Sequence, residues 1–567
     1  MNVIKSLLFK LRYLLNKVPK YIYVLLFVSF IVVLPARINL GVFGHDSAFH
    51  MMNILSMDFN TSLFEFPTRI RPLIANGFGY GTGIFYPQLF HFLVFAILKI
   101  VKLFNPFYLS SMISLNIFLF LLTFFISLSM RTLLYKYTSN KVVSTIGAIL
   151  YILYPYFITD IYVRSAYPEL FVFLSLPLIF LGLYYLFNEN NKYKFYIFFV
   201  LGFSLIFSSH LISSVYTIIF TGIFILCNFK KLFKNKNIIH LGIASIFVLL
   251  ITLDFLVPIL EHKLFGNYLV FNEYIMSSKN SVSFSTLPFD FLFIVSDSIG
   301  FYIPMSLFLL VLFGLFNIKK LKQYIDSSTI IGYFLIFIIS FFLVISSDVW
   351  FMIPSFLINI QFAWRLCGYI CFSICVMAAF GLSLIPKRYF KIVSISSIVI
   401  SLLAFLFMIY YPNHIIIENE VIDFNLGAGV QKEYLPVNTF DNLFYFNTRN
   451  KDVFVINGDA KTKILENDTP YLKFKIDTEK ESLVEIPRIF YLWYNITLTD
   501  QNKNKIKLDY YENEYGFIEF LVPESGIVTV EYKKSLISSI AALISIISLF
   551  IFPIYLYILK RKTTLVN

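Results

Sequence analysis

The chain has 567 residues, of which 58% are hydrophobic, 19% are aromatic and only 14% are charged. This composition, with a mean hydropathy of +0.77, excludes a soluble globular protein, because no single core could hide so much apolar side chain. The formal net charge is +13. The basic residues stand in short clusters between apolar runs, a pattern typical of membrane topology and not of a nucleic-acid-binding face. The four cysteines all lie inside apolar runs, so no disulfide or zinc framework is readable.

The chain begins with a basic, amphipathic stretch, residues 1–20, which no small-residue cleavage site follows. We interpret it as a cytoplasmic lead-in and not as a cleaved signal peptide. Beyond it come apolar runs long enough to cross roughly 30 Å of hydrocarbon. They cover residues 21–38, 108–130, 142–158, 169–187, 194–210, 211–228, 238–258, 301–318, 328–346, 366–386, 390–411 and 535–559.

One further apolar run, 84–104, decides the predicted topology. The basic clusters should all face the cytoplasm; they fall at 5–20, 131–141, 192–194, 230–236, 319–322, 387–391 and 560–562. If 84–104 crossed the bilayer, every later cluster would face outward. If it lies along the outer surface, within an outer loop 39–107 that carries surface helices, all of them face inward. We therefore predict about twelve transmembrane helices in the plasma membrane, with both termini cytoplasmic.

Residues 412–533 differ in kind from the rest of the chain. Acids outnumber bases there, and segments such as YLKFKID and GFIEFLV alternate apolar and polar residues between turn signals. We predict a small, mostly β, extracytoplasmic domain. It separates the helical domain 21–411 from the last helix and basic tail, 534–567.

Asp46 stands between His45 and His50 directly after the first apolar run. The segment before AFHMMNIL has the form of a helix start, so Asp46 could simply be an N-cap. His50 follows four residues later, on the same helix face. The pair could therefore hold a divalent cation, or act as a general base with its orienting partner.

The same outer loop holds further candidates. Arg69 and Arg71 flank an FPTRIRP turn, and the run NGFGYGTG places four glycines before FYP. Glycine at this density indicates close backbone approach to a ligand or to another loop, although a plain flexible linker remains an alternative.

Later outer loops add charged side chains. The loop DIYVRSAYPEL carries Arg164 and Glu169, and QFAWR places Arg365 at the start of a membrane helix. Arginine suits a phosphate through its planar fork; an ion pair for the first and snorkelling for the second are the structural alternatives. His210 in FSSHLISS fits a hydrogen-bonded structural histidine better than a ligand. Asp254 inside an apolar run is a functional candidate with an unknown partner.

Taken in order, GHDSAFH, GFGYGTGIFYP, DIYVRSAYPEL, SSHLISS, QFAWR, EYLP and the closing β segment give the chain a family resemblance. It resembles the bacterial multi-pass membrane proteins described as related to 6-pyruvoyl-tetrahydropterin synthase, and the YfhO-like glycosyltransferases. Both belong with the GT-C glycosyltransferase superfamily. QFAWR departs from the pattern by an alanine where proline is usual, and GTGIFYPQ by a glutamine where a second proline is common.

The resemblance implies transfer of a sugar from a polyprenyl-phosphate donor to a cell-envelope polymer, lipid or protein on the outer face. Asp46 would be the base of an inverting attack, and Arg164 or Arg365 would hold the departing phosphate. A divalent metal, Mg²⁺ or Mn²⁺, is optional, with Asp46 and His50 as its ligands. The predicted substrate-binding residues are His50, Arg69, Arg71, Tyr80, Tyr86, Arg164, Glu169, His210 and Arg365.

Two other classes of function fit the same composition. A transporter or flippase of a lipid-linked saccharide would use similar charges, but these should lie near the midplane beside broken helices or inverted repeats. No internal repeat is visible in the sequence. A non-catalytic envelope assembly protein would instead bind through its β domain.

Overall fold

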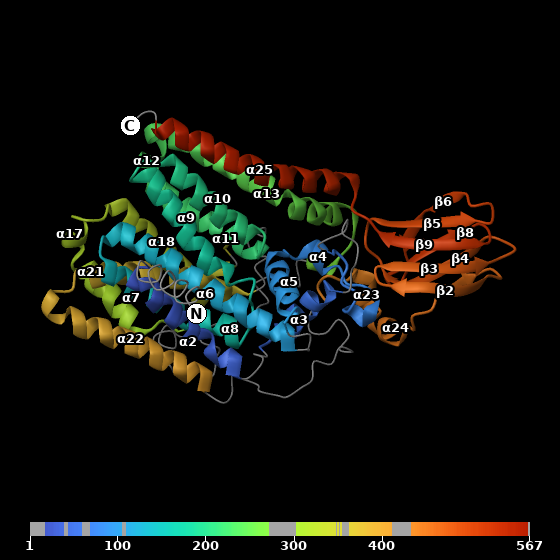
Figure 1. The fold of residues 1–567 in the computed structure, drawn as a ribbon, viewed down its shortest axis with the longest axis horizontal. Helices are drawn as coiled ribbons and strands as arrows, with labels where there is room; N and C mark the ends of the chain where they lie inside the picture. The colour runs from blue at the N-terminus through green and yellow to red at the C-terminus, as the bar shows by residue number, and fades with distance from the viewer. Residues whose placement is uncertain are drawn as a thin grey trace, which may run out of the picture.

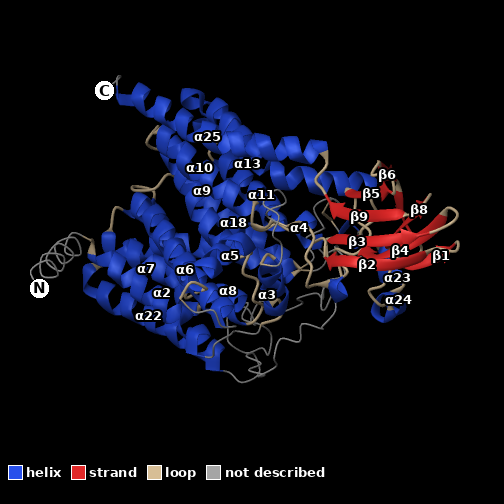
Figure 2. Ribbon diagram, turned by 45° about the vertical axis from the view of Figure 1, so that its right-hand side comes forward, coloured by secondary structure: helices blue, strands red, loops and turns tan. Residues whose placement is uncertain are grey.

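The computed structural model describes residues 18–38, 44–58, 68–104, 109–271, 302–346, 349–350, 352–353, 362–410 and 432–564. The predicted lead-in up to residue 17, parts of the outer loop, and residues 412–431 of the predicted β domain lie outside this set. Within it, a large helical body carries a β domain at one end, which Figure 1 shows at the right and Figure 2 shows in red.

Helices make up most of the described chain. The longer ones are α2 (Lys20–Ile38), α3 (Ser47–Ser56), α5 (Leu89–Val101), α6 (Leu109–Thr138), α7 (Lys141–Ile152), α8 (Pro155–Tyr162), α9 (Phe171–Phe187), α10 (Lys192–Phe207), α11 (Leu211–Cys227), α13 (Asn237–Phe265), α16 (Met305–Phe316), α18 (Ser327–Ile345), α21 (Cys367–Ser383), α22 (Lys387–Tyr410) and α25 (Leu536–Thr564). Short helices include α4 (Thr82–Phe85), α12 (Phe229–Phe233), α17 (Ile318–Leu321), α23 (Val437–Asp441), α24 (Leu443–Thr448) and the 3₁₀ turn η5 (Ala363–Leu366).

By length and composition, six helices in the described residues could each cross a membrane, and the bent pair α7 and α8 raises this to seven. Other apolar helices, among them α9, α11 and α16, are shorter than 18 residues. Several long apolar helices are consistent with a membrane protein. The predicted number of about twelve crossings exceeds what helix length alone supports.

The β domain is a sandwich of two antiparallel sheets. One sheet has the order β1-β4-β8-β7 and the other β2-β3-β9-β5-β6. The strands are β1 (Phe454–Asn457), β2 (Lys461–Asp468), β3 (Tyr471–Asp477), β4 (Ser482–Ile489), β5 (Tyr494–Asp500), β6 (Lys505–Leu508), β7 (Tyr510–Glu512), β8 (Phe517–Val522) and β9 (Gly526–Tyr532). Alternate residues of β3 and β9, such as Phe474 and Val528, face the interior, as period-two patterning predicts.

The basic helix ends gather at one end of the helical body. Lys136 at the end of α6 pairs with Glu189 after α9, and Lys231 of α12 pairs with Asp326 before α18. In Figure 1, α12, α17 and the C-terminus lie at the end remote from the sandwich. This gathering agrees with the predicted placement of the basic clusters on one side.

The uncertain run 84–104 forms the end of α4 and all of α5; α5 packs against α3 and α6, and α4 packs against α13 (Figure 1). The backbone N–H of Leu89 donates to Ser208 O, and Lys99 and Lys102 both pair with Asp58 just after α3. These contacts tie the run to α3 and to the turn between α10 and α11, and its surface-lying position stays a prediction.

The glycine-rich loop is where the sandwich docks. A Cβ on Gly81 would lie 2.5 Å from the Tyr491 ring of the sandwich, so only glycine fits there. The Thr469 hydroxyl donates to Gly77 O, and Ile489 N–H donates to Phe78 O. Of the alternatives for the glycine run, the structure supports close approach to another part of the chain.

Candidate functional site

Two loops far apart in the sequence are joined at the end of the helical body that faces the sandwich. The N–H groups of His45 and Asp46 donate to Val163 O (3.0 Å) and Arg164 O (2.8 Å). The N–H of Gly44 donates to the Ser165 hydroxyl. These bonds bring Asp46 beside the DIYVRSAYPEL loop.

A cavity of about 370 Å³ opens where these loops meet. Most of the predicted site residues line it: Asp46, His50, Tyr86, Arg164, Glu169, His210 and Arg365. They come from α3, from the loops before α5, α9 and α11, and from η5. Sequence positions more than 300 residues apart thus meet around one space.

Asp46 takes the N-cap position of α3, but its side chain makes no capping hydrogen bond. Burial raises the pKa of its carboxyl above the usual 3.8, although the charges of Arg164 and Arg365 work in the opposite direction. A carboxylate that lines a cavity and has a raised pKa is a better proton acceptor than an exposed one.

His50 is buried one turn after Asp46, and its Nδ1 lies 3.0 Å from Nε2 of His91 on α5. Burial lowers the pKa of His50 to about 3, so the imidazole is neutral at physiological pH. Because the contact with His91 uses Nδ1, only Nε2 can serve a ligand in the cavity. Within the described residues, no three His, Cys, Asp or Glu side chains gather as a metal site, and the optional metal stays a prediction.

Arg164 is the centre of a buried ion-pair network. Its Nη1 lies 2.7 Å from Asp160 Oδ1, 3.0 Å from Glu169 Oε2 and 2.8 Å from the Tyr156 hydroxyl. Tyr156 in turn donates to Glu169 Oε1. The guanidinium is therefore bound to protein acids, and its clearest role is to hold Glu169 at the cavity wall.

Arg365 is arranged differently. Its Nε lies 3.7 Å from Glu169 Oε2, longer than a hydrogen bond, and its side chain lines the cavity. The stacked rings of Phe362 and Trp364, 4.3 Å apart, stand beside it. Of the two arginines predicted to hold a phosphate, Arg365 has the looser tie to a protein acid.

His210 both caps a helix and lines the cavity. Its Nδ1 accepts the N–H of Ser213 (3.3 Å) and lies 2.7 Å from the Ser213 hydroxyl, which fixes the start of α11. Its ring packs edge-on against Tyr86 at 6.3 Å. The expected structural histidine is thus found at the cavity wall.

Three predicted site residues lie outside the cavity lining. Arg69 forms an ion pair with Asp254 at 3.0 Å. Arg69 is thus a partner of Asp254, for which the sequence indicated none. Arg71 is fully buried and donates to Asn53 Oδ1 and Gln88 Oε1. Tyr80 accepts the N–H of Tyr434 on its hydroxyl, at the junction with the sandwich. The structure gives all three positions structural partners.

Several residues of the site were not predicted. Glu433 and Tyr434, from the segment that leads into the sandwich, line the cavity together with Lys263 at the end of α13. In the sequence, the EYLP segment that contains them counts only as part of the resemblance. His91 lies in the apolar run QLFHFL, where nothing local distinguishes a working histidine from a core one.

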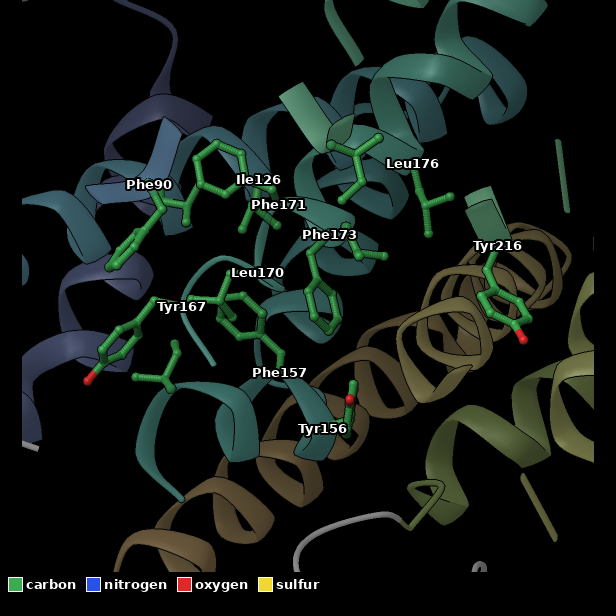
Figure 3. Close-up of a cluster of buried hydrophobic side chains, with 14 of the residues drawn as sticks. Phe90, Ile126, Tyr156, Phe157, Tyr167, Leu170, Phe171, Phe173, Leu176 and Tyr216 are labelled. Atoms are coloured by element: carbon green, nitrogen blue, oxygen red, sulfur yellow. The ribbon is translucent and has the colours of Figure 1, made fainter. Parts of the chain in front are cut away.

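Buried aromatic side chains pack around the loop that carries Arg164. Figure 3 shows several of them, among them Tyr156, Phe157, Tyr167 and Phe173. Phe157 meets Phe173 edge-on at 5.0 Å, and Tyr167 lies 5.5 Å from Phe90 of α5. Close-packed rings of this kind fix the loop and hold the polar side chains at the cavity in place.

No protein-family model matches the chain, and no curated protein is similar enough to count as a match.

Proposed function

We propose that the chain is an integral membrane glycosyltransferase of the GT-C type, with about twelve crossings. It would move a sugar from a polyprenyl-phosphate donor to a cell-envelope acceptor on the outer face. The observation that carries the proposal is one cavity that is lined by the Asp46 carboxylate and by Arg365. His210 and Tyr86, two hydrogen-bonding side chains that are uncharged at neutral pH, line the same cavity.

The proposed reaction step uses the Asp46 carboxylate and the Arg365 guanidinium. The acceptor hydroxyl attacks the anomeric carbon, and its proton passes to the Asp46 carboxylate as the new C–O bond forms. The bond from the anomeric carbon to the phosphate oxygen breaks, and the phosphate leaves with the electron pair. Arg365 stabilises the charge that develops on that phosphate. Attack from the side opposite to the leaving group gives inversion.

Arg164 has a positioning role in this proposal. It forms one ion pair with Glu169 and one with Asp160, each within 3.0 Å, and orders the loop to which the Asp46 backbone is hydrogen-bonded. The neutral His50, oriented by His91, offers Nε2 to a sugar or acceptor hydroxyl. A divalent metal, if one binds, would be held by Asp46 and His50 and would supply a Lewis acid for the phosphate.

The test is transfer by the purified protein in detergent. Labelled polyprenyl-phosphate sugar and an extract of cell-envelope acceptor are mixed with the protein, and both glycosylated product and free polyprenyl phosphate are measured. Production of both in equal amounts supports a transferase. A flippase has no membrane to work across in detergent and an assembly protein makes no product, so intact donor after prolonged incubation would overturn the proposal.

A further inference from the structure

The lysines of the sandwich strands are confined to one of its two sheets. Three strands of the five-stranded sheet each contain a Lys-x-Lys segment, which gives six lysines: Lys461 and Lys463 on β2, Lys473 and Lys475 on β3, and Lys505 and Lys507 on β6. The described strands of the other sheet contain no lysine, and their one arginine, Arg488, is buried. Positive charge is therefore divided unequally between the two faces of the sandwich.

The strand register places these lysines on the outer surface of the five-stranded sheet. Residues two apart on a strand point to the same side, so each Lys-x-Lys segment has both lysines on one face. Phe474 is buried in the sandwich interior, so Lys475 beside it points outward. Lys475 pairs across the sheet with Ile527. Ile527 in turn pairs with Thr499, and Thr499 pairs with Lys505 on the edge strand. We refer to this surface as the lysine face.

Short side chains separate the lysines of β3 from those of β6. The two strands between them, β9 and β5, present Thr529, Thr497 and Thr499 on the lysine face. Neighbouring strands are about 4.8 Å apart, so Lys473 and Lys507, which share one row of paired residues, begin about 14 Å apart. Their long side chains can reach a ligand that lies over the threonines from both sides.

Ordinary surface roles account for only part of this arrangement. Lysine on an edge strand discourages pairing with another chain, and β2 and β6 are the two edges of this sheet. Strand β3 is not an edge, yet Lys473 and Lys475 both lie on it. Solubility calls for mixed charges over the whole surface and does not require one sheet to hold every lysine. The lysine face is thus a cluster and not scattered surface charge.

Acidic side chains neutralise the lysine face only in part. Lys475 forms an ion pair with Asp477 of its own strand at 2.9 Å, but both side chains are more than half exposed. Glu466 is paired across from Lys473. The other acids of this sheet stand at the ends of their strands or next to them: Asp468, Asp500 and Glu531.

Three of the lysines have no acid across from them. Lys463 faces Lys475, and the two lysines of β6 face threonines. Like charges that stand directly opposite each other destabilise an antiparallel strand pair. An anion bound between such lysines would remove this repulsion.

We propose that the lysine face binds a linear polyanion, and the predicted outer position of the sandwich makes an anionic polymer of the cell envelope its source. Each contact of an exposed lysine is weak, so affinity has to come from many charges on one chain. Lysine binds phosphate or carboxylate as a point charge and does not require one fixed geometry.

Two features separate this surface from a lipid site and from the Asp46 cavity. The strands run in roughly the same direction as α13 and α25 (Figure 1), so the lysine face points sideways and not toward a membrane that those helices would cross. None of the six lysines is among the residues that line the cavity. The inference therefore goes beyond the proposed transfer step and does not depend on it.

The two lysines of β3 are the most informative to replace. Lys473→Gln with Lys475→Gln removes charge from the middle of the lysine face, at side chains that are half-buried and exposed, and should leave folding near wild type. Lys320→Gln with Lys322→Gln is the matched control, because it removes the same charge from exposed side chains at α17, the end remote from the sandwich (Figure 1). Lys473→Arg with Lys475→Arg retains the charge.

The experiment measures binding to the purified full-length protein in an uncharged detergent, by fluorescence anisotropy. The probes are labelled long-chain polyphosphate, labelled polygalacturonate and labelled dextran as the uncharged chain. In about 50 mM salt we expect the wild type to bind at least one polyanion and not dextran, and the double Gln variant of β3 to bind about tenfold more weakly. The Arg variant and the α17 control should bind as the wild type does. In about 1 M salt, where charges are screened over about 3 Å, binding should be lost.

The probe that binds more tightly identifies the anionic group, phosphate or carboxylate. Three results would overturn the inference: no binding of either polyanion, equal weakening in the β3 variant and in the α17 control, or displacement of the polymer by an anionic phospholipid in the micelles at equal charge. Because the assay contains no sugar donor, these results leave the proposed transfer untouched, and failure of transfer would leave polyanion binding intact.

Discussion

At the scale of single residues, the site depends on a carboxylate kept where its charge is unfavourable. Burial raises the pKa of Asp46, while Arg164 and Arg365 lower it by a smaller amount. In the folded state the proton is bound more tightly than in the unfolded chain, so ionised Asp46 lowers stability at neutral pH. The Asp46 side chain does not cap α3, and the proposed role as a proton acceptor would account for its position at the cavity.

The pH dependence of transfer should follow from this shift. Asp46 accepts a proton only when ionised, so the rate should be constant above its raised pKa and fall about tenfold per pH unit below it. His50, with a pKa of about 3, cannot produce a limb between pH 5 and 8. Rate profiles of the wild type and of His50→Gln should therefore share the same acidic midpoint, above 3.8; a midpoint that moves in the His50 variant would assign the limb to the histidine.

Substitutions of Arg164 and Arg365 should differ in their effects on stability and on donor binding. Arg164→Gln leaves Asp160 and Glu169 buried without their cation, which should cost about 3–5 kcal/mol of unfolding free energy. Arg365→Gln leaves Arg164, the cation nearer to Glu169 (3.0 Å against 3.7 Å), in place, so the loss of unfolding free energy should be smaller while the KM for the donor rises. Thermal unfolding in detergent and donor titration measure both. Equal loss of stability in the two variants would contradict these roles.

At the scale of elements, the pairing of the Gly44–Asp46 segment with residues 163–165 builds the site. A Cβ on Gly44 would lie 2.5 Å from the Ser165 hydroxyl oxygen and 2.6 Å from Val163 O, too close for any other residue. The glycine is required because two backbones meet side by side there. The pairing fixes the position of Asp46 without using its carboxylate.

Gly44→Ala should therefore separate the two segments. We expect a loss of about 1–3 kcal/mol of unfolding free energy, typical of overpacking, with a much larger fall in transfer because Asp46 shifts. Gly242→Ala, where a Cβ meets nothing, is the control and should retain both properties. Thermal unfolding and transfer assayed together test this; normal transfer by Gly44→Ala would show that the pairing does not position the carboxylate.

Local sequence predicted the elements well but not every partner. Apolar runs such as 211–228 and 238–258 recur as α11 and α13, since a long apolar run needs only its own composition to form a buried or lipid-facing helix. Arg69 and Tyr80 share a loop with Asp46, yet their partners, Asp254 and Tyr434, lie 185 and 354 residues away along the chain. The partner of such a side chain depends on how distant segments pack together. The spacing of residues along the sequence does not reveal this packing.

At the scale of the whole molecule, charge is divided between two ends. Lys136, Lys231 and their acidic partners lie at one end, and Asp46, Arg365 and the sandwich lie at the other. Helix length supports six or seven crossings among the described residues, so the twelve crossings and the surface position of 84–104 stay predictions.

Topology can be tested with an impermeant thiol reagent on intact cells. Lys320 of α17 and Glu481 before β4 are both exposed, and the native cysteines are buried or half-buried. Glu481→Cys should react from outside, and Lys320→Cys should react only after the membrane is opened. Labelling of Lys320→Cys in intact cells would reverse the orientation and place the basic ends outside.

The sandwich supports part of the cavity wall. Tyr491 donates to Tyr434 O, and Tyr434 with Glu433 lines the cavity. The sequence predicted the β domain from its alternation but gave no sign that the segment leading into it lines the cavity, because the other lining residues lie far away along the chain. This segment and the helical body thus line one cavity.

The central claim is that Asp46 is the proton acceptor of a sugar transfer, and the most direct measurement compares Asp46→Asn with wild type in the purified transfer assay. Asp58→Asn, which lies in the same loop but pairs with Lys99 and Lys102, is the matched control. We predict that Asp46→Asn binds the donor and folds normally but transfers about 10²–10⁴-fold more slowly, while Asp58→Asn stays near wild type. Unimpaired transfer by Asp46→Asn would contradict the account.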